Sequence, residues 1–318
     1  MPNKTKALLQ EKGFFLTKKK LKMYHTHKTI VFLDGKWISA AEANTSLYDQ
    51  TLHYGNGVFE GIRSYKAESG THIFKAEEHY ERLLASAKKM HISIDYSVSE
   101  LVKISYELLE KNNLTNAYLR PLISLTPNMA LTSNSTPKVF ICAWKWEKYL
   151  GEKPLNIMTS SYTRPHPKSC HVEAKTVGHY TNSILATTEA KSKGFDEALL
   201  LDVNNNVAEG PGANFFYEKN RTLYTCPLGN ILPGITRATV LEMAKELEIK
   251  VVEKHFTINE VRNADSAFFT GTAAEIAPIG SLDKNPFPLL WSESLGHELS
   301  RLYQKKVTNQ DYYHFELV

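Results

Sequence analysis

The chain has 318 residues, of which 42% are hydrophobic and 23% are charged, and its formal net charge is +4. This length and composition predict a globular protein with a large core, most simply in two domains, and no run of about 18 apolar residues predicts a membrane span. Seven lysines and one glutamate give residues 1–22 a charge of +6, which leaves −2 for the remainder and argues against a nucleic-acid-binding face on the body of the protein.

The first half of the chain predicts a tail followed by a smaller α+β domain. Residues 1–27 are expected to form a basic, disordered tail, and residues 28–150 the domain. Strands are expected where β-branched and aromatic side chains are common, at residues 30–38, 57–75, 117–125 and 138–146. Helices are expected where apolar residues recur at helical spacing, at residues 76–92 and 97–114. A polar loop is expected at residues 127–137.

The second half predicts a larger α+β domain over residues 155–318, after a linker at residues 147–154. Its strands are expected at residues 155–161, 197–203 and 214–226, and its helices at residues 181–194 and 236–249. Strands and helices do not alternate regularly, so a doubly wound sheet is not expected, and no glycine-rich nucleotide-binding loop follows a strand. The expected fold class is α+β with two domains.

Short-range signals locate several turns and helix ends. Asp34-Gly35 predicts a two-residue hairpin turn, and Gly70 marks a turn between two strands of the 57–75 segment. Ser97 and Glu100 have the spacing of a capping box. Gly194 is a natural helix end, and the segment 214–226 is expected to fold back at Lys219-Asn220.

One lysine has few charged neighbours in the sequence. Lys175 lies in the run HVEAKTVGHYTNSILA, residues 171–186, where Glu173 is the only other formally charged residue. Burial without a partner lowers the pKa of a lysine, and the neutral amine is a nucleophile that forms Schiff bases. The alternative is a lysine near a helix start that pairs with Glu173 and has no chemical role.

A pyridoxal 5′-phosphate (PLP) enzyme needs an anion near the pyridine nitrogen and a cup of N–H donors for the phosphate. Glu209, in NNNVAEGPGANFF, could supply the anion. The helix start at Gly234-Ile235-Thr236 and the turn at Gly271-Thr272-Ala273 could supply the N–H groups, and Arg82 could complete the phosphate site. Each feature has an ordinary alternative: a surface turn, a helix cap, a tight turn or a solvated arginine.

Six segments in this order are more specific than any one of them. LHYGNGVFEGIR, YLRPL, EAKTVGHY, AEGPGANFF, LPGITR and FTGTAAEI together resemble the class IV, fold type IV PLP-dependent aminotransferases, over residues 28–310. Within this class the chain resembles the branched-chain amino acid aminotransferases. FEGIR and YLRP discriminate best, because D-amino acid aminotransferases and aminodeoxychorismate lyases of the same fold usually differ there. Those two enzymes are the alternatives, with a non-catalytic binding protein as a third.

The resemblance implies transfer of an amino group between L-leucine, L-isoleucine or L-valine and 2-oxoglutarate, through a PLP Schiff base on Lys175 and with ping-pong kinetics. The catalytic residue is Lys175. The implied cofactor-binding residues are Arg82, Lys175, Tyr180, Glu209, Ile235, Thr236 and Thr272. The implied substrate-binding residues are Tyr54, Phe59, Tyr118, Arg120, Trp146, Tyr149, Thr272 and Ala273. Tyr54 is expected to reach the neighbouring subunit's site, so a homodimer or larger homo-oligomer is expected.

The cysteines bear on metal binding and on the location of the protein. The three cysteines are far apart and have no metal-ligand spacing, so we expect no metal and a cytoplasmic location.

The family often has Gly-Gly-Asn before the site tyrosine, where this chain has Val177-Gly178-His179, and often a Glu where it has Ala213. These departures bear on loop packing, substrate preference and rate.

Overall fold

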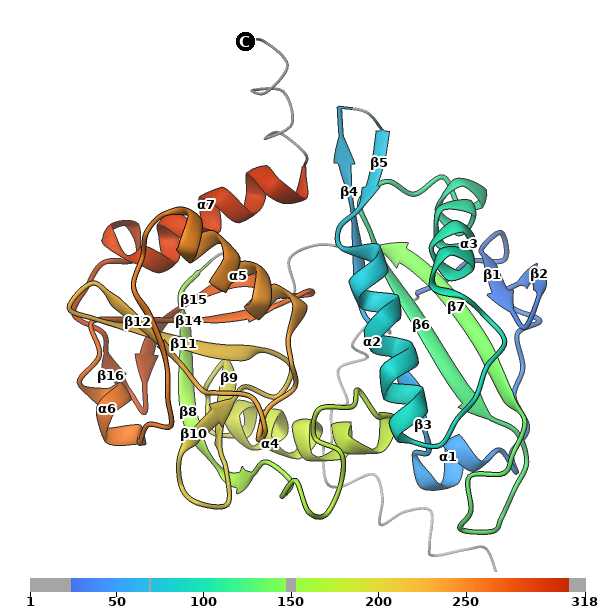
Figure 1. Ribbon diagram of the computed structural model, residues 1–318, viewed down its shortest axis with the longest axis horizontal. Coiled ribbons are helices and arrows are strands. Elements are labelled where there is room, and N and C mark those ends of the chain that lie inside the picture. Colours follow the sequence, from blue (N-terminus) through green and yellow to red (C-terminus); the bar gives the residue numbers. More distant parts are fainter. Residues whose placement is uncertain (1–23, 69, 147–152, 309–318) are drawn as a thin grey trace, which may run out of the picture.

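The strands that the structure describes form two sheets, and these lie side by side (Figure 1). The structure, a computed structural model, describes residues 24–68, 70–146 and 153–308. Both halves contain helices and strands, as the α+β prediction requires. Most of the predicted tail (1–27) and linker (147–154) lie outside the described residues. Among the residues that are described, no helix is long and apolar enough to cross a membrane.

The first sheet is antiparallel and belongs to the N-terminal half. Its strands are β1 (Ile30–Leu33), β2 (Lys36–Ser39), β3 (Gly57–Phe59), β4 (Ile62–Ala67), β5 (Gly70–Ile73), β6 (Ala117–Leu125) and β7 (Pro137–Lys145). They are ordered β2-β1-β7-β6-β4-β5, and β3 also pairs with β6. The helices of this half are α1 (Gln50–Tyr54), α2 (Ala76–Lys89) and α3 (Val98–Lys111).

Helices α2 and α3 form because apolar residues recur on one face of each. Tyr80 and Leu83 of α2 and Leu101 and Leu108 of α3 are completely buried against the first sheet. Ser97 caps α3 through the predicted capping box with Glu100. Helix α2 lies on the side of its sheet that faces the C-terminal half (Figure 1), so its side chains can reach the junction of the two halves.

The second sheet is mixed and belongs to the C-terminal half. Its strands are β8 (Leu155–Thr163), β9 (Glu197–Leu201), β10 (Val207–Glu209), β11 (Asn214–Lys219), β12 (Thr222–Thr225), β13 (Val251–Glu253), β14 (Ser266–Gly271), β15 (Glu275–Leu282) and β16 (Asn285–Pro286). The order is β10-β9-β8-β15-β14-β11-β12-β13, with β16 on β15. An additional β10–β11 pairing closes six of these strands into a ring.

Between residues 153 and 308, the helices that accompany the second sheet are α4 (Tyr180–Ser192), α5 (Ile235–Glu246), α6 (Ile258–Arg262) and α7 (Leu295–Val307). Helix α7 packs on the sheet through buried side chains that recur every four residues, namely Leu295, Leu299, Tyr303 and Val307. Short 3₁₀ turns at Val177–His179 and Trp291–Glu293 precede α4 and α7.

The junction between the halves is held by backbone contacts around β3. Thr176 forms an isolated antiparallel bridge with Val58. The Gly178 amide donates to the Gly55 carbonyl at 3.0 Å. A side chain on Gly55 would place its Cβ 2.6 Å from the Gly178 Cα, and Gly55 has a φ of +67°, so glycine is required at this contact. The segment before α4 is thereby joined to the first sheet.

Most of the predicted elements are confirmed, with corrections at their ends. The hairpin at Asp34-Gly35 has positive φ at both turn residues, as a type I′ turn requires, and Gly194 ends α4 with a φ of +83°. The segment 57–75 forms three strands instead of two, and Gly70 begins β5. The predicted turn at Lys219-Asn220 is wrong by one residue, because Lys219 pairs with Thr222 and leaves Asn220-Arg221 as the turn.

Candidate active site

A cavity of about 680 Å³ lies at the junction of the two halves. This volume is within the usual range for a site that encloses a small molecule. The cavity brings together twelve of the residues implied by the sequence, namely Phe59, Arg82, Tyr118, Arg120, Trp146, Lys175, Tyr180, Glu209, Ile235, Thr236, Thr272 and Ala273. Tyr54 is elsewhere on the described surface and is 46% exposed, and Tyr149 lies outside the described residues.

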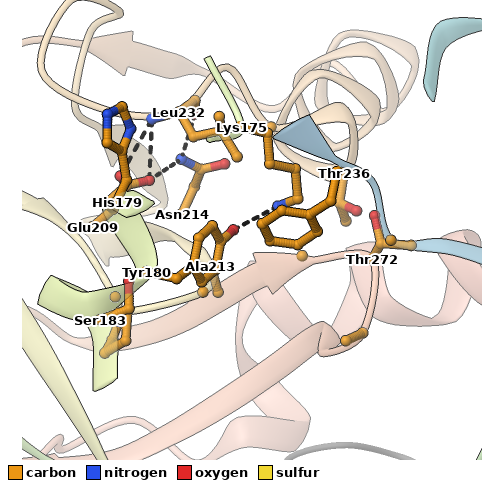
Figure 2. A pocket seen from close by; sticks show the side chains of 18 of the residues that line it. Lys175, His179, Tyr180, Ser183, Glu209, Ala213, Asn214, Leu232, Thr236 and Thr272 are labelled. Carbon is orange, nitrogen blue, oxygen red and sulfur yellow. Dashed lines mark hydrogen bonds between the residues drawn. The ribbon is translucent and has the colours of Figure 1, made fainter. Parts of the chain in front are cut away.

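Lys175 lies between the two ends of the cavity. Its Nζ donates to the Tyr180 hydroxyl at 2.7 Å (Figure 2). The same atom lies 5.1 Å from the centre of the Phe59 ring. Glu173 pairs instead with Lys89 at 2.8 Å, so the simple alternative of a Lys175–Glu173 ion pair is wrong. Lys175 therefore presents an amine, hydrogen-bonded to a phenol, to the cavity.

Glu209 forms one end of the cavity, on β10, and is only 4% exposed. Its carboxylate accepts from Asn214 at 3.0 Å and from the Leu232 amide (Figure 2). It also pairs with the Arg164 Nε at 2.9 Å. Burial raises the pKa of Glu209, while the Arg164 charge opposes that shift. The surface-turn alternative for Glu209 is wrong. This end of the cavity suits a cationic or N–H group of a ligand.

The opposite end of the cavity suits an anion. Gly234 is the N-cap of α5 and has no side chain that could cap this helix. The first intrahelical bond runs from Ala238 to Gly234, so the amides of Ile235 and Thr236 make no such bond. Arg82 lies beside this helix start and donates through Nη1 to the Pro233 carbonyl at 2.8 Å. Free amides, the helix dipole and a guanidinium favour phosphate here.

The turn between β14 and β15 also lines the anion end. Thr272 and Ala273 lie in this turn, and Glu275 follows it with a left-handed φ of +57°. The buried Glu275 carboxylate accepts from Arg63 and from the Tyr65 hydroxyl, each at 2.9 Å. Both donors belong to β4, so the first sheet anchors a turn of the second sheet.

An aromatic group surrounds a guanidinium in the remaining part of the cavity. The Arg120 guanidinium lies 4.7 Å from the Phe59 ring centre and donates to the Tyr118 hydroxyl at 3.2 Å. The rings of Tyr118 and Trp146 are stacked with centroids 4.6 Å apart. None of the acidic side chains that the structure describes forms an ion pair with Arg120. This region can bury an apolar side chain and still offer a cation to a carboxylate.

Several polar residues that support the site were not predicted from the sequence. Glu60 contacts Arg82, and His79 contacts Thr272. Arg164 and Asn214 contact Glu209. Glu275 anchors the β14–β15 turn. Glu60 stands inside FEGIR, a segment that carried the family resemblance, but nothing local indicated its partner. Arg164 directly follows β8 in the structure, but the strand predicted from the sequence ended at residue 161, so no local signal indicated this residue.

The residues that line the cavity fit PLP when the anion end, the Glu209 end and the region between them are taken together. A phosphate matches the Arg82 and α5 end, and a protonated pyridine nitrogen matches the buried Glu209 carboxylate. Lys175 and Tyr180 lie between these ends (Figure 2), where an amine can bond covalently to an aldehyde and a phenol can contact a ring oxygen. The residues present are therefore sufficient to hold this cofactor.

Comparisons with known proteins give consistent results. Residues 57–282 match the family described as amino-transferase class IV. The chain is 43% identical over 260 residues to a branched-chain-amino-acid aminotransferase of Pseudomonas aeruginosa, a match that covers 80% of this chain and 85% of the relative.

Two solved structures are also similar. The branched-chain aminotransferase of Thermoproteus uzoniensis, solved with norvaline, has a TM-score of 0.86 and 36% identity, covering 89% of this chain and 96% of that one. The branched-chain amino acid aminotransferase of Thermobaculum terrenum, solved in its PLP form, has a TM-score of 0.85 and 30% identity, covering 91% of this chain and 96% of that one.

Proposed function

This chain belongs to the amino-transferase class IV family and has PLP as its cofactor, and we propose that it transfers the amino group between L-leucine, L-isoleucine or L-valine and 2-oxoglutarate. The observation that carries the proposal is one cavity in which Lys175, the buried Glu209 and an anion-binding end adjoin an aromatic pocket containing Arg120. The names of the similar proteins support the branched-chain substrates.

The proposed cofactor contacts follow the polarity of the cavity. Lys175 makes the covalent attachment through Nζ, and Tyr180 donates to the phenolic oxygen. Glu209 pairs with the pyridine nitrogen, while Arg82 and the amides of Ile235 and Thr236, with Thr272, bind the phosphate. Burial raises the pKa of Glu209, and the charge of its partner Arg164 opposes this rise and so favours the carboxylate form.

PLP, when bound, supplies an aromatic electron sink that makes the bonds at the substrate Cα easier to break. The chain itself supplies the base and the orientation. Lys175 Nζ, once free, takes the proton from Cα and returns a proton during the transfer, and the 2.7 Å hydrogen bond to Tyr180 orients it. Tyr118 and the amides of Thr272 and Ala273 hold the α-carboxylate.

The substrate pocket is proposed to accept two chemically different side chains in turn. Burying a leucine, isoleucine or valine side chain among Phe59, Tyr118 and Trp146 is worth about 1.5–3 kcal/mol. The Arg120 guanidinium in the same region binds the distal carboxylate of 2-oxoglutarate. Because amino donor and oxo-acid acceptor use one cavity successively, ping-pong kinetics follow.

Other sequence-based expectations stay predictions. They are the domain boundaries at 28–150 and 155–318, the homodimer in which Tyr54 reaches the neighbouring subunit's site, the place of Tyr149 in the substrate pocket, and the cytoplasmic location. Tyr54 is compatible with a role in another subunit because it is exposed and does not line the cavity of its own chain.

The deciding experiment is a titration of the PLP-loaded protein followed by visible absorption. L-leucine should remove the band of the lysine-bound cofactor, and 2-oxoglutarate added afterwards should restore it. D-alanine, tested in a separate sample, should have no effect. A response to D-alanine and none to L-leucine would overturn the proposal in favour of D-amino acid transfer. Lys89→Ala, which changes an exposed lysine of α2, serves as the control and should behave like the parent protein.

A further inference from the structure

A completely buried carboxylate, Glu60, lies behind the anion end of the cavity. Glu60 follows β3 and is 0% exposed. Both carboxylate oxygens contact Arg82: Oε1 accepts from Nε at 2.7 Å and Oε2 accepts from Nη2 at 2.9 Å. Oε2 also accepts from His79 Nδ1 at 2.7 Å. One carboxylate therefore holds two side chains of α2, the helix that faces the C-terminal half.

The contacts of Arg82 leave part of its guanidinium for a ligand. A guanidinium has five N–H groups. Two of them bond to Glu60, and a third bonds from Nη1 to the Pro233 carbonyl at 2.8 Å. These bonds fix the plane of the group beside the start of α5, and one N–H on each of Nη1 and Nη2 stays unused by them. A planar donor held in this way has little rotational freedom to lose when it binds an oxyanion.

The contacts of His79 extend the same network to a second cavity residue. His79 is 1% exposed, and its Nε2 lies 3.5 Å from the Thr272 hydroxyl oxygen. Because Nδ1 donates to Glu60, the remaining ring nitrogen is left for Thr272. Thr272 lies in the β14–β15 turn, so the network connects α2 of the first half with a turn of the second half.

We propose that Glu60 is a positioning residue for the cofactor phosphate, holding Arg82 directly and Thr272 through His79. The proposal rests on the proposed function, in which Arg82 and Thr272 bind the phosphate. It adds a separate claim about Glu60 and His79, which do not line the cavity.

Electrostatics alone would give Glu60 the opposite effect. Burial alone would raise the pKa of Glu60. The Arg82 charge and the His79 contacts instead hold this pKa well below its usual range, so the group is an anion. An anion behind Arg82 repels phosphate. If Glu60 mattered only through its charge, removing that charge would strengthen phosphate binding. If Glu60 positions Arg82, the same change weakens binding, because an amide has one acceptor oxygen and turns an N–H₂ group towards Arg82 or His79.

The test compares the dissociation constants of PLP and of pyridoxal, which lacks the phosphate, by visible absorption. Glu60→Gln should lower the preference for PLP over pyridoxal by roughly tenfold, as expected when a charge-assisted hydrogen bond is lost. The ³¹P NMR signal of bound PLP should also shift. An unchanged or increased preference for PLP would overturn the proposal. Glu218→Gln, at a buried carboxylate that accepts from the Leu295 amide and does not line the cavity, is the matched control and should leave the preference unchanged.

A double-mutant cycle tests the His79 branch even if Glu60→Gln fails to fold. His79→Phe and Thr272→Val should each lower the preference for PLP over pyridoxal. Because His79 acts through Thr272, this preference should be no lower in the double variant than in the Thr272 variant alone. Fully additive losses would overturn this branch.

Arg82→Gln separates the inference from the proposed function on which it rests. If this variant keeps the parent's preference for PLP, the phosphate assignment itself fails. If it loses the preference while Glu60→Gln keeps it, only the role of Glu60 fails.

Discussion

The Phe59 amide donates to the Lys175 carbonyl at 3.1 Å, and the Phe59 ring lies 5.1 Å from the Lys175 Nζ. The first contact fixes the backbone of the lysine, and the second restricts its side chain. Lys175 belongs to the C-terminal half by sequence, but β3 of the N-terminal half holds it. The cavity therefore depends on the two halves staying in contact.

Replacing Lys175 should remove catalysis while leaving the fold intact. We expect Lys175→Ala to lower the rate of transfer from L-leucine to 2-oxoglutarate by at least about 10³-fold, because both the covalent attachment and the proton-transferring amine are lost. Steady-state rates and the visible spectrum measure the effect, and circular dichroism checks folding. Near-parent activity in this variant would contradict the assignment of Lys175.

The catalytic residues were predictable because local motifs carry them, whereas their supporting partners were not. Lys175 and Tyr180 are five residues apart, and Glu209 lies beside a Gly-Pro-Gly segment, so short stretches of sequence pointed to all three. In contrast, Glu275 and Arg63 are 212 residues apart, and their ion pair exists only after two sheets have met.

The fold shows the same division between local and long-range information. The Asp34-Gly35 turn and the capping box at Ser97 are decided within a few residues, and both were predicted. Helix α7 was not predicted, although its apolar residues recur every four positions and pack on the second sheet. The six-stranded ring requires β8 to pair with β15 and β14 to pair with β11, and these strands are far apart in the sequence, so local patterns do not contain this order.

Glu209→Gln should separate cofactor chemistry from cofactor retention. A neutral amide cannot stabilise a protonated pyridine nitrogen as a carboxylate does, so the rate should fall by about 10–10³-fold. Affinity for PLP should fall less, because the phosphate end and Lys175 are unchanged. Steady-state rates and a PLP titration by visible absorption measure the two effects. Equal losses in both quantities would show that Glu209 contributes to binding alone.

Arg120→Met should alter the preference among oxo acids. The variant keeps an unbranched apolar stem against Phe59 but removes the charge, so 2-oxoglutarate loses its partner while 4-methyl-2-oxopentanoate does not. The kcat/KM for 2-oxoglutarate should fall by about 10²-fold, corresponding to roughly 2–3 kcal/mol, with a much smaller change for the branched oxo acid. Parallel losses for both oxo acids would mean that Arg120 acts on the shared part of the substrates.

Glu60 should make the stability of the cofactor-free protein depend on pH in the acid range. Its folded-state pKa lies below the ordinary carboxyl value of 4.5, because Arg82 and His79 outweigh the burial that opposes this shift. A carboxyl whose pKa is lower in the folded state contributes stability above its unfolded pKa, and this contribution is lost as the pH falls towards the folded pKa. At pH 7, Glu60→Gln should therefore lower the free energy of unfolding by about 3 kcal/mol, as expected for a broken buried pair.

The pH dependence of that loss distinguishes the ion pair from simple packing. As the pH is lowered below 4.5, the unfolded parent gains a proton at residue 60 that the folded parent does not accept, so the difference between parent and variant should shrink. Urea unfolding at several pH values from 7 down to the acid limit of the native state measures the difference. Glu218→Gln provides the comparison, because burial raises the pKa of Glu218 and its pH trend should have the opposite sign. A loss in Glu60→Gln that stays constant with pH would assign the effect to packing and not to the charge.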